Sequence, residues 1–112
     1  MTTPTPASHA ASIFRIDRFV VPADALPAFM ERLRFTQRTL DTVPGCKQNL
    51  LLQREDRPGE IDIITLVEWS NAEAIAAART TMQERYAEEG FDPAAFIQKL
   101  GVQADMGVYR NA

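Results

Sequence analysis

The sequence predicts an α+β domain of the ferredoxin-like class, a βαββαβ chain built around a four-stranded antiparallel sheet. Four segments rich in β-branched and aromatic residues and two longer segments of helical periodicity follow one another in this βαββαβ order. Turn signals made of proline and glycine separate the segments, and the two halves share one strand-helix-strand plan. If both strand-helix-strand connections are right-handed, as is usual, both helices lie on one face of the sheet.

The first half of the chain supplies a strand, a helix and a second strand. Residues 13–21, IFRIDRFVV, are typical of a strand, and Pro22 cannot donate a further sheet hydrogen bond. Asp24 is the expected N-cap of the helix, in which apolar residues recur at helical spacing until the Pro-Gly pair at 44–45 forces a turn. Residues 46–54 are expected to form the second strand.

The second half repeats this plan and adds a short helix. A hairpin loop at 57–60 precedes the third strand at 61–69. Ser70 and Glu73 have the spacing of a capping box, which predicts that the second long helix begins directly after the strand. The remaining expected features are the end of that helix near Glu89, a glycine cap at Gly90, a short helix between Asp92-Pro93 and Gly101, and a last strand at 102–110.

Composition restricts the classes of protein to consider. At 112 residues the chain fits one globular domain over 13–112, preceded by a flexible tail over 1–12. A net charge of −3 with scattered basic residues argues against nucleic acid as a partner. No apolar run approaches the roughly 20 residues of a membrane helix, and no signal-peptide pattern is present. We therefore expect a cytoplasmic protein that does not bind a membrane.

The strands predict that both faces of the sheet need cover. Leu50, Leu51 and Leu52 are consecutive, and residues 61–69 also send apolar side chains to both faces. One face of four strands measures roughly 440 Å² in plan, from spacings of about 4.8 Å between strands and about 3.3 Å per residue. Such an area is as large as the apolar patches that monomers expose. We therefore predict a homodimer that packs sheet to sheet.

Polar and aromatic residues at inward positions predict a small-molecule pocket. Trp69 ends the third strand beside a helix start, where a large aromatic ring suits a pocket wall. A helical wheel places Gln37 within the apolar stripe of the first helix, and Arg79 and Tyr86 within that of the second. Each also has a simpler interpretation, Trp69 as core and the others as satisfied polar groups. An inward arginine needs a charged partner, for which the candidates are Glu68 and Asp17.

Several classes of catalytic site lack their residues in this sequence. The only histidine, His9, lies in the predicted tail, so a zinc site, a Ser-His-Asp triad and a proximal haem ligand are disfavoured. The five glycines form no phosphate-binding or nucleophile-elbow motif. Cys46 has no histidine to activate it. We expect neither a metal nor a cofactor.

From about residue 13 to residue 110, the sequence resembles the antibiotic biosynthesis monooxygenase family of dimeric α/β-barrel proteins. The similarity lies in RFVVP, the PG turn, TLVEWSNAEA, GFDPAAF, LGV and MGVY. It implies a ferredoxin-like subunit, a dimer joined through its sheets and a cavity between sheet and helices. Members of that family include cofactor-free oxygenases of phenols and quinols, haem-degrading enzymes that use a helix histidine absent here, and small-molecule isomerases.

The resemblance also implies roles for single residues. Trp69 matches the strand-end tryptophan of oxygenases in that family, and Thr65 stands where several active members have asparagine. We therefore predict a cofactor-independent monooxygenase-like protein acting on a small aromatic or quinol-type substrate. The alternatives are an isomerase or cyclase using the same pocket, and a non-catalytic ligand-binding dimer. The residues assigned to catalysis are Trp69, Asp17 and Glu68, and those assigned to substrate binding are Gln37, Arg79, Tyr86 and Thr65.

Overall fold

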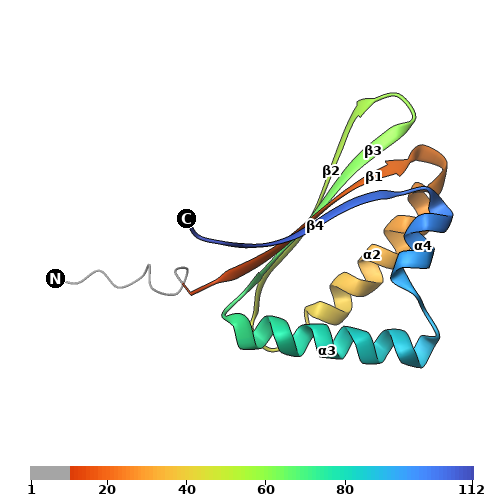
Figure 1. The fold of residues 1–112 in the computed structure, drawn as a ribbon. Coiled ribbons are helices and arrows are strands. Elements are labelled where there is room, and N and C mark those ends of the chain that lie inside the picture. The colour runs from red at the N-terminus through yellow and green to blue at the C-terminus, as the bar shows by residue number, and fades with distance from the viewer. Residues whose placement is uncertain (1–10) are drawn as a thin grey trace.

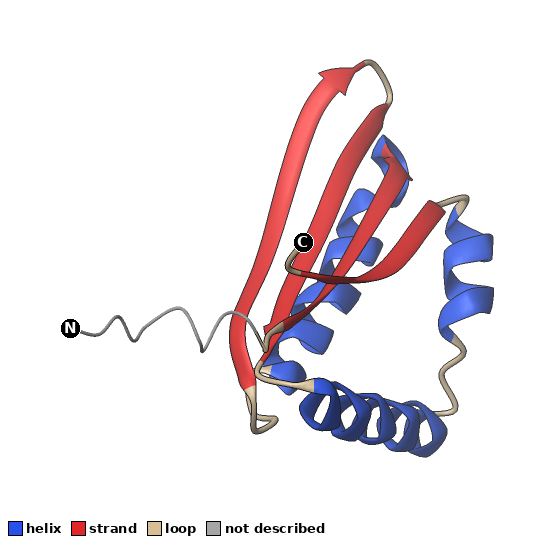
Figure 2. Cartoon of the chain, turned by 60° about the vertical axis from the view of Figure 1, so that its left-hand side comes forward, coloured by secondary structure: helices blue, strands red, loops and turns tan. Residues whose placement is uncertain are grey.

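The computed structural model describes residues 11–112, in which one antiparallel sheet carries all of the helices on one face (Figures 1 and 2). In chain order the elements are β1 (Ile13–Pro22), the short 3-10 helix η1 (Ala23–Ala25), α2 (Leu26–Leu40), β2 (Cys46–Arg57), β3 (Glu60–Trp69), α3 (Ala72–Glu89), α4 (Pro93–Leu100) and β4 (Gln103–Arg110). The strands lie in the order β2-β3-β1-β4, and all neighbours are antiparallel. The predicted ferredoxin-like fold is confirmed.

Most of the predicted flexible tail, residues 1–10, lies outside the described part of the chain. Ser12 is buried, and its Oγ donates a hydrogen bond of 2.7 Å to the carboxylate of Glu68. The folded domain therefore includes Ser12. Within residues 11–112, no helix is both long and apolar enough to cross a lipid bilayer.

The starts of the two long helices differ from the prediction. Asp24 is not an N-cap, because it lies inside η1, and α2 begins directly afterwards without a side-chain cap. Asn71 rather than Ser70 caps α3, and its Oδ1 accepts a hydrogen bond of 2.9 Å from the N–H of Ala74. The N–H of Ser70 donates instead to the carbonyl of Gly45 at 2.9 Å, so the predicted capping box does not form.

The predicted features after α3 are confirmed. Gly90 and Gly101 have left-handed φ angles of 65° and 73°, and they end α3 and α4 respectively. Asp92 caps α4, because its Oδ1 accepts hydrogen bonds from two backbone N–H groups of the first turn. The β2–β3 hairpin is tighter than expected, with its turn between Arg57 and Glu60 and both strands extended to those residues.

Two clusters of buried side chains hold the helices against the inner face of the sheet. The larger cluster joins β1 and β3 to α2, and the smaller one joins the end of β3 to α3. Between the clusters, Asp17 of β1 and Thr65 of β3 are paired across the strands and share the inner face. The clusters include Phe19, Phe29 and Ile63 in the larger one and Val67, Trp69 and Ala78 in the smaller one.

The outer face of the sheet, which we define as the face opposite the helices, is apolar at its centre. Cross-strand register places Leu50, Leu66 and Ile16 in one row of this face, and Leu52 and Ile64 in the next. Leu50 and Leu52 are 37% and 49% exposed. Figure 2 shows that α2, α3 and α4 all lie on the other side of the strands. The predicted apolar second face is therefore present.

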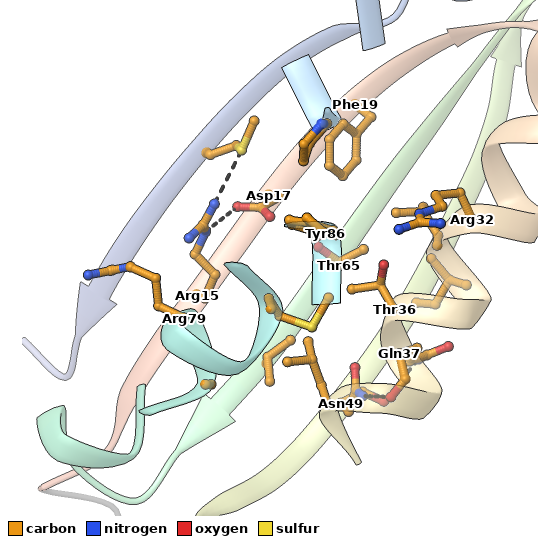
Figure 3. Close-up of a pocket in the computed structure, with 18 of the residues that line it drawn as sticks. Arg15, Asp17, Phe19, Arg32, Thr36, Gln37, Asn49, Thr65, Arg79 and Tyr86 are labelled. Carbon is orange, nitrogen blue, oxygen red and sulfur yellow. Dashed lines mark hydrogen bonds and ion pairs between the residues drawn. The ribbon is translucent and has the colours of Figure 1, made fainter. Parts of the chain in front are cut away.

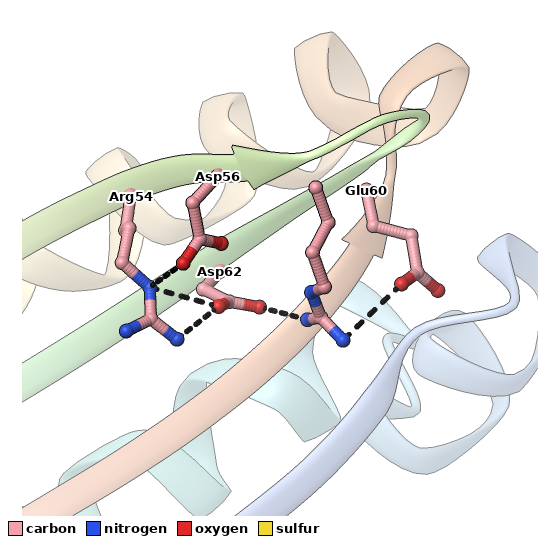
Figure 4. Close-up of polar contacts among 5 residues, drawn as sticks. Arg54, Asp56, Glu60 and Asp62 are labelled. Carbon is pink, nitrogen blue, oxygen red and sulfur yellow. Dashed lines mark hydrogen bonds and ion pairs between the residues drawn. The ribbon is translucent and has the colours of Figure 1, made fainter.

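A network of charged side chains lies at the hairpin end of the outer face (Figure 4). The carboxylate of Asp62 accepts a hydrogen bond of 2.6 Å from Nη2 of Arg54 and another from Arg57. Asp56 and Glu60 extend the network, each 3.4 Å from one of the two arginines. The hydrogen bond from Arg54 lowers the pKa of Asp62. The apolar centre of the outer face therefore has a charged border at this end.

Gly45 is expected not to tolerate alanine. Its φ is 93°, and a Cβ at this position would lie 2.5 Å from the Cβ of Ala74 in the first turn of α3. Backbone strain and overpacking together should lower the free energy of unfolding by about 3 kcal/mol in Gly45→Ala. Urea denaturation measures this loss. Gly59→Ala is the control, because Gly59 has a φ of 78° but no atom within 4 Å of the added Cβ. Equal losses in the two variants would show that the approach of α3 to Gly45 is unimportant.

Candidate functional site

A cavity of about 400 Å³ lies between the inner face of the sheet and the helices (Figure 3). Strands β1 and β3 contribute alternate side chains to its floor, α2 and α3 form its walls, and α4 with the segment before it closes one end. Most of the lining side chains are apolar, and about a third of them are polar or charged, three arginines included. Small-molecule sites commonly have this composition and size.

Trp69 closes the cavity where β3 meets α3. Its side chain is 2% exposed and packs against Val67 and Ala78 while also lining the cavity. Among residues 11–112, no side chain or carbonyl accepts a hydrogen bond from its indole N–H. Trp69 is therefore both a core residue and a wall of the cavity.

Asp17 is the acidic residue among the cavity-lining residues of the described part of the chain, 11–112. Its side chain is 16% exposed, and its Oδ1 accepts a hydrogen bond of 2.7 Å from Nε of Arg15. Nη2 of Arg15 donates in turn to Sδ of Met106 on β4 at 3.2 Å. Burial raises the pKa of Asp17, although hydrogen bonds from Arg15 and the Gly107 backbone and the charge of Arg15 oppose this change. A carboxylate with a raised pKa is suited to accept a proton from a ligand.

Gln37 and Thr65 are also on the cavity lining. Nε2 of Gln37 donates to the carbonyl of Asn49 at 3.3 Å, and Nδ2 of Asn49 donates to the carbonyl of Gln37 at 3.0 Å. This reciprocal pair ties α2 to β2. Gln37 therefore has a structural contact in addition to its place on the cavity wall, which leaves its second amide N–H for a ligand.

Arg79 and Tyr86 line the cavity from α3, on the helix face that the wheel indicates. Arg79 is exposed at the mouth of the cavity, and its guanidinium has no hydrogen bond or ion pair with any residue in 11–112. The predicted pairing of Arg79 with Glu68 or Asp17 is wrong. Asp17 is paired within its own strand instead, and Glu68 lies elsewhere.

Glu68 does not reach the cavity. Its neighbours Val67 and Trp69 face the helices, and side chains alternate along a strand, so Glu68 lies on the outer face. It is 4% exposed, accepts a hydrogen bond from Ser12 and lies 3.7 Å from Nζ of Lys47. A general base must reach the proton that it removes. The prediction that Glu68 acts as a base in this cavity is therefore wrong.

Arg32 of α2 is a cavity residue that the sequence analysis missed. Its Cζ lies 3.6 Å from the ring centroid of Phe91 and 5.7 Å from that of Tyr86, and its Nη2 lies 2.6 Å from Oε1 of Glu89. These contacts join α2 to the C-terminal end of α3. The available signal was its position three residues after Phe29, at the border of the apolar stripe of the helix.

The described residues contain no group of three or more His, Cys, Asp or Glu side chains arranged to hold a metal ion. Cys46 lies outside the cavity lining, at the start of β2. Burial, together with the charge of Asp41, raises the pKa of the Cys46 thiol, which keeps it protonated and poorly nucleophilic.

Solved structures share this fold. An antibiotic biosynthesis monooxygenase candidate from Nitrosomonas europaea is 16% identical, with a TM-score of 0.68 over 91% of each chain. A variant of SnoaB, a cofactor-independent oxygenase from Streptomyces nogalater, is 23% identical, with a TM-score of 0.57 over 91% of this chain and 94% of its own. A dimeric ferredoxin-like protein from an uncultured marine organism is 6% identical, with a TM-score of 0.68 over 90% and 95%.

No protein-family model and no curated protein matches the chain. At identities below 25%, the likeness to the solved structures establishes a common fold. The expected resemblance to monooxygenases of this class is therefore confirmed at the level of the fold, and the choice of reaction depends on the site itself.

Proposed function

We propose that the protein is a cofactor-independent monooxygenase-like enzyme that binds a small aromatic or quinol-type substrate in the cavity. The observation that supports this most directly is the carboxylate of Asp17, which is largely buried and lies inside a mainly apolar cavity bounded by Trp69. A largely buried base in a mainly apolar cavity suits the removal of a proton from an aromatic substrate. The presence of a cofactor-independent oxygenase among proteins of the same fold adds support.

In the proposed reaction, Asp17 takes a phenolic or activated C–H proton from the substrate. The resulting anion gives two electrons to dioxygen and forms a C–O bond, and the distal oxygen takes the proton from Asp17, which gives a hydroperoxide. Loss of the remaining hydrogen of that carbon as a proton then forms C=O from the C–H electrons and breaks the O–O bond, and the departing hydroxide combines with this proton to leave as water. The N–H of Trp69 and the second amide N–H of Gln37 would donate hydrogen bonds to the anion, and the positive charge of Arg79 would favour a negatively charged ligand as a whole. The enclosing side chains orient the substrate and keep water away from the anion.

We further propose that the protein works as a homodimer joined through the outer sheet face. Phe14 and Tyr109 extend the apolar centre of that face, and Tyr109 is 52% exposed in the single chain. A hydrophobic centre with a charged border is the usual anatomy of a protein interface. Two faces of this size would bury on the order of 1,000 Å², which is enough for a specific dimer.

Oxygen-electrode measurements with a panel of naphthols and anthrones test the reaction. We expect protein-dependent oxygen uptake that matches product formation and is unchanged by a metal chelator. Product formation without uptake would overturn the proposal in favour of an isomerase or cyclase. No turnover, together with no thermal stabilisation by any compound in the panel, would overturn it in favour of a non-catalytic protein.

A further inference from the structure

We infer that the ligand of this cavity is an anion, a planar aromatic carboxylate whose acid group binds to Arg15 and Arg79. The inference rests on the proposed function in taking the cavity as the substrate site. It adds a permanent acid group to the substrate class, separate from the carbon that reacts.

The charge of the cavity lining is the first observation. Three arginines line the cavity, namely Arg15, Arg32 and Arg79, and Asp17 is the one acidic residue among the described lining residues. The chain as a whole has a formal net charge of −3. A cavity lined with excess positive charge in an acidic protein attracts anions and disfavours cations.

The second observation is which guanidinium groups have strong acceptors. Arg32 is neutralised by Glu89 through two hydrogen bonds, of 2.6 and 3.4 Å. Arg79 has no acceptor among the described residues. Arg15 uses Nε on Asp17, but its Nη2 meets only the sulfur of Met106, which is a weak acceptor, and its Nη1 has no described partner.

The third observation is where these donors lie. Figure 3 shows Arg15 and Arg79 on the same side of the cavity, where α3 faces the strands, and Arg32 on the other side. A carboxylate matches the planar fork of a guanidinium and can accept from two N–H groups at once. The adjoining floor and walls, including Val67, Trp69 and Ile75, are apolar. An acid group at the arginine side therefore leaves the aromatic ring over this apolar surface.

Calorimetric titration under anaerobic conditions at pH 7.5 tests the inference with 1-hydroxy-2-naphthoic acid and its methyl ester, which differ in the negative charge. We expect wild-type protein to bind the acid at least about tenfold more tightly than the ester, as hydrogen bonds to charged groups usually allow. Arg79→Gln and Arg15→Gln should each remove most of this preference. Arg85→Gln is the matched control, because it removes the same charge from the same helix as Arg79 but lies off the cavity lining.

An acid affinity no greater than that of the ester, including no measurable binding of either compound, overturns the inference. An equal loss of the preference for the acid in Arg85→Gln and Arg79→Gln also overturns the inference, since only the overall charge of the protein would then matter. Thermal denaturation of each variant shows whether it is folded. A clear preference for the acid without oxygen uptake for any substrate would overturn the proposed oxygenase function but support the anion site. Oxygen uptake with equal affinities for the acid and the ester would support the oxygenase function and overturn the anion site.

Discussion

Asp17→Asn is expected to lower the rate of substrate-dependent oxygen uptake by about 10²–10⁴-fold, the usual contribution of a general base. Asparagine keeps the size of the side chain and an oxygen that can accept the hydrogen bond from Nε of Arg15, but it cannot take up a proton. Steady-state oxygen consumption gives the rate, and anaerobic titration with a naphthol gives the affinity. We expect the affinity to change by less than about threefold, because the loss lies in the chemical step.

The same substitution is expected to maintain or raise stability at neutral pH. Because burial raises the pKa of Asp17 in the folded protein, the folded state binds this proton more tightly than the unfolded state does. The free energy of unfolding therefore falls as the pH rises from the unfolded pKa through the folded pKa. Above that window the ionised side chain is a cost that asparagine does not carry. Thermal denaturation should show this advantage at pH 7 and not at a pH below the ordinary carboxyl pKa.

Asp105→Asn is the control for the oxygen-uptake rate and for the binding affinity. Asp105 is exposed on β4 and lies off the cavity lining, so its substitution should change neither rate nor affinity. If Asp17→Asn retained more than about a tenth of the wild-type rate, the base would have to be another group. If it unfolded the protein at pH 7, the role of Asp17 would be structural.

Leu50→Lys is expected to convert a homodimer into a monomer. Leu50 lies in the central apolar row of the outer face and is 37% exposed in the single chain, so the Leu50→Lys variant should still fold. The lysine ammonium should, however, be too costly to bury between two sheets. In a two-fold dimer the substitution acts on both copies, and we expect association to weaken by about 100-fold or more. Light scattering at micromolar concentration should give twice 12.5 kDa for the wild-type chain and 12.5 kDa for the variant.

Val108→Lys is the matched control for the dimer. Val108 is also an exposed apolar strand residue, at 52%, but its register with Arg15 places it on the inner face. The Val108→Lys variant should therefore remain dimeric. A wild-type chain of 12.5 kDa, or equal dissociation by both variants, would show that the outer face is not the interface.

The order of the elements could be predicted from the sequence because each depends on local chemistry. The positions of Gly90, Asp92 and Gly101 indicated caps that involve only neighbouring backbone groups, and the structure has all three. The start of α3 could not be predicted in the same way. Ser70 and Asn71 can both cap a helix, and the hydrogen bond from the Ser70 N–H to Gly45, 25 residues earlier in the chain, decides between them.

The helix side of the cavity was easier to predict than the sheet side. Helical periodicity predicted that Gln37, Arg79 and Tyr86 line the cavity, because their positions fall among apolar residues that recur at helical spacing in α2 and α3. The strands are apolar on both faces, so alternation alone could not tell whether Asp17 or Glu68 faces the helices. That choice depends on which face the helices cover, and tertiary packing fixes it.

The two ends of α3 are attached by contacts of different kinds. Its first turn packs directly on the backbone of Gly45, whereas its last turn is joined to α2 through Arg32, by the ion pair with Glu89 and the stacked ring of Phe91. A partly exposed ion pair separates at little cost, while close backbone packing does not. We therefore expect α3 to pivot about its first turn when a longer ligand binds. The cavity would then lengthen at the C-terminal end of α3 and keep its shape at the N-terminal end.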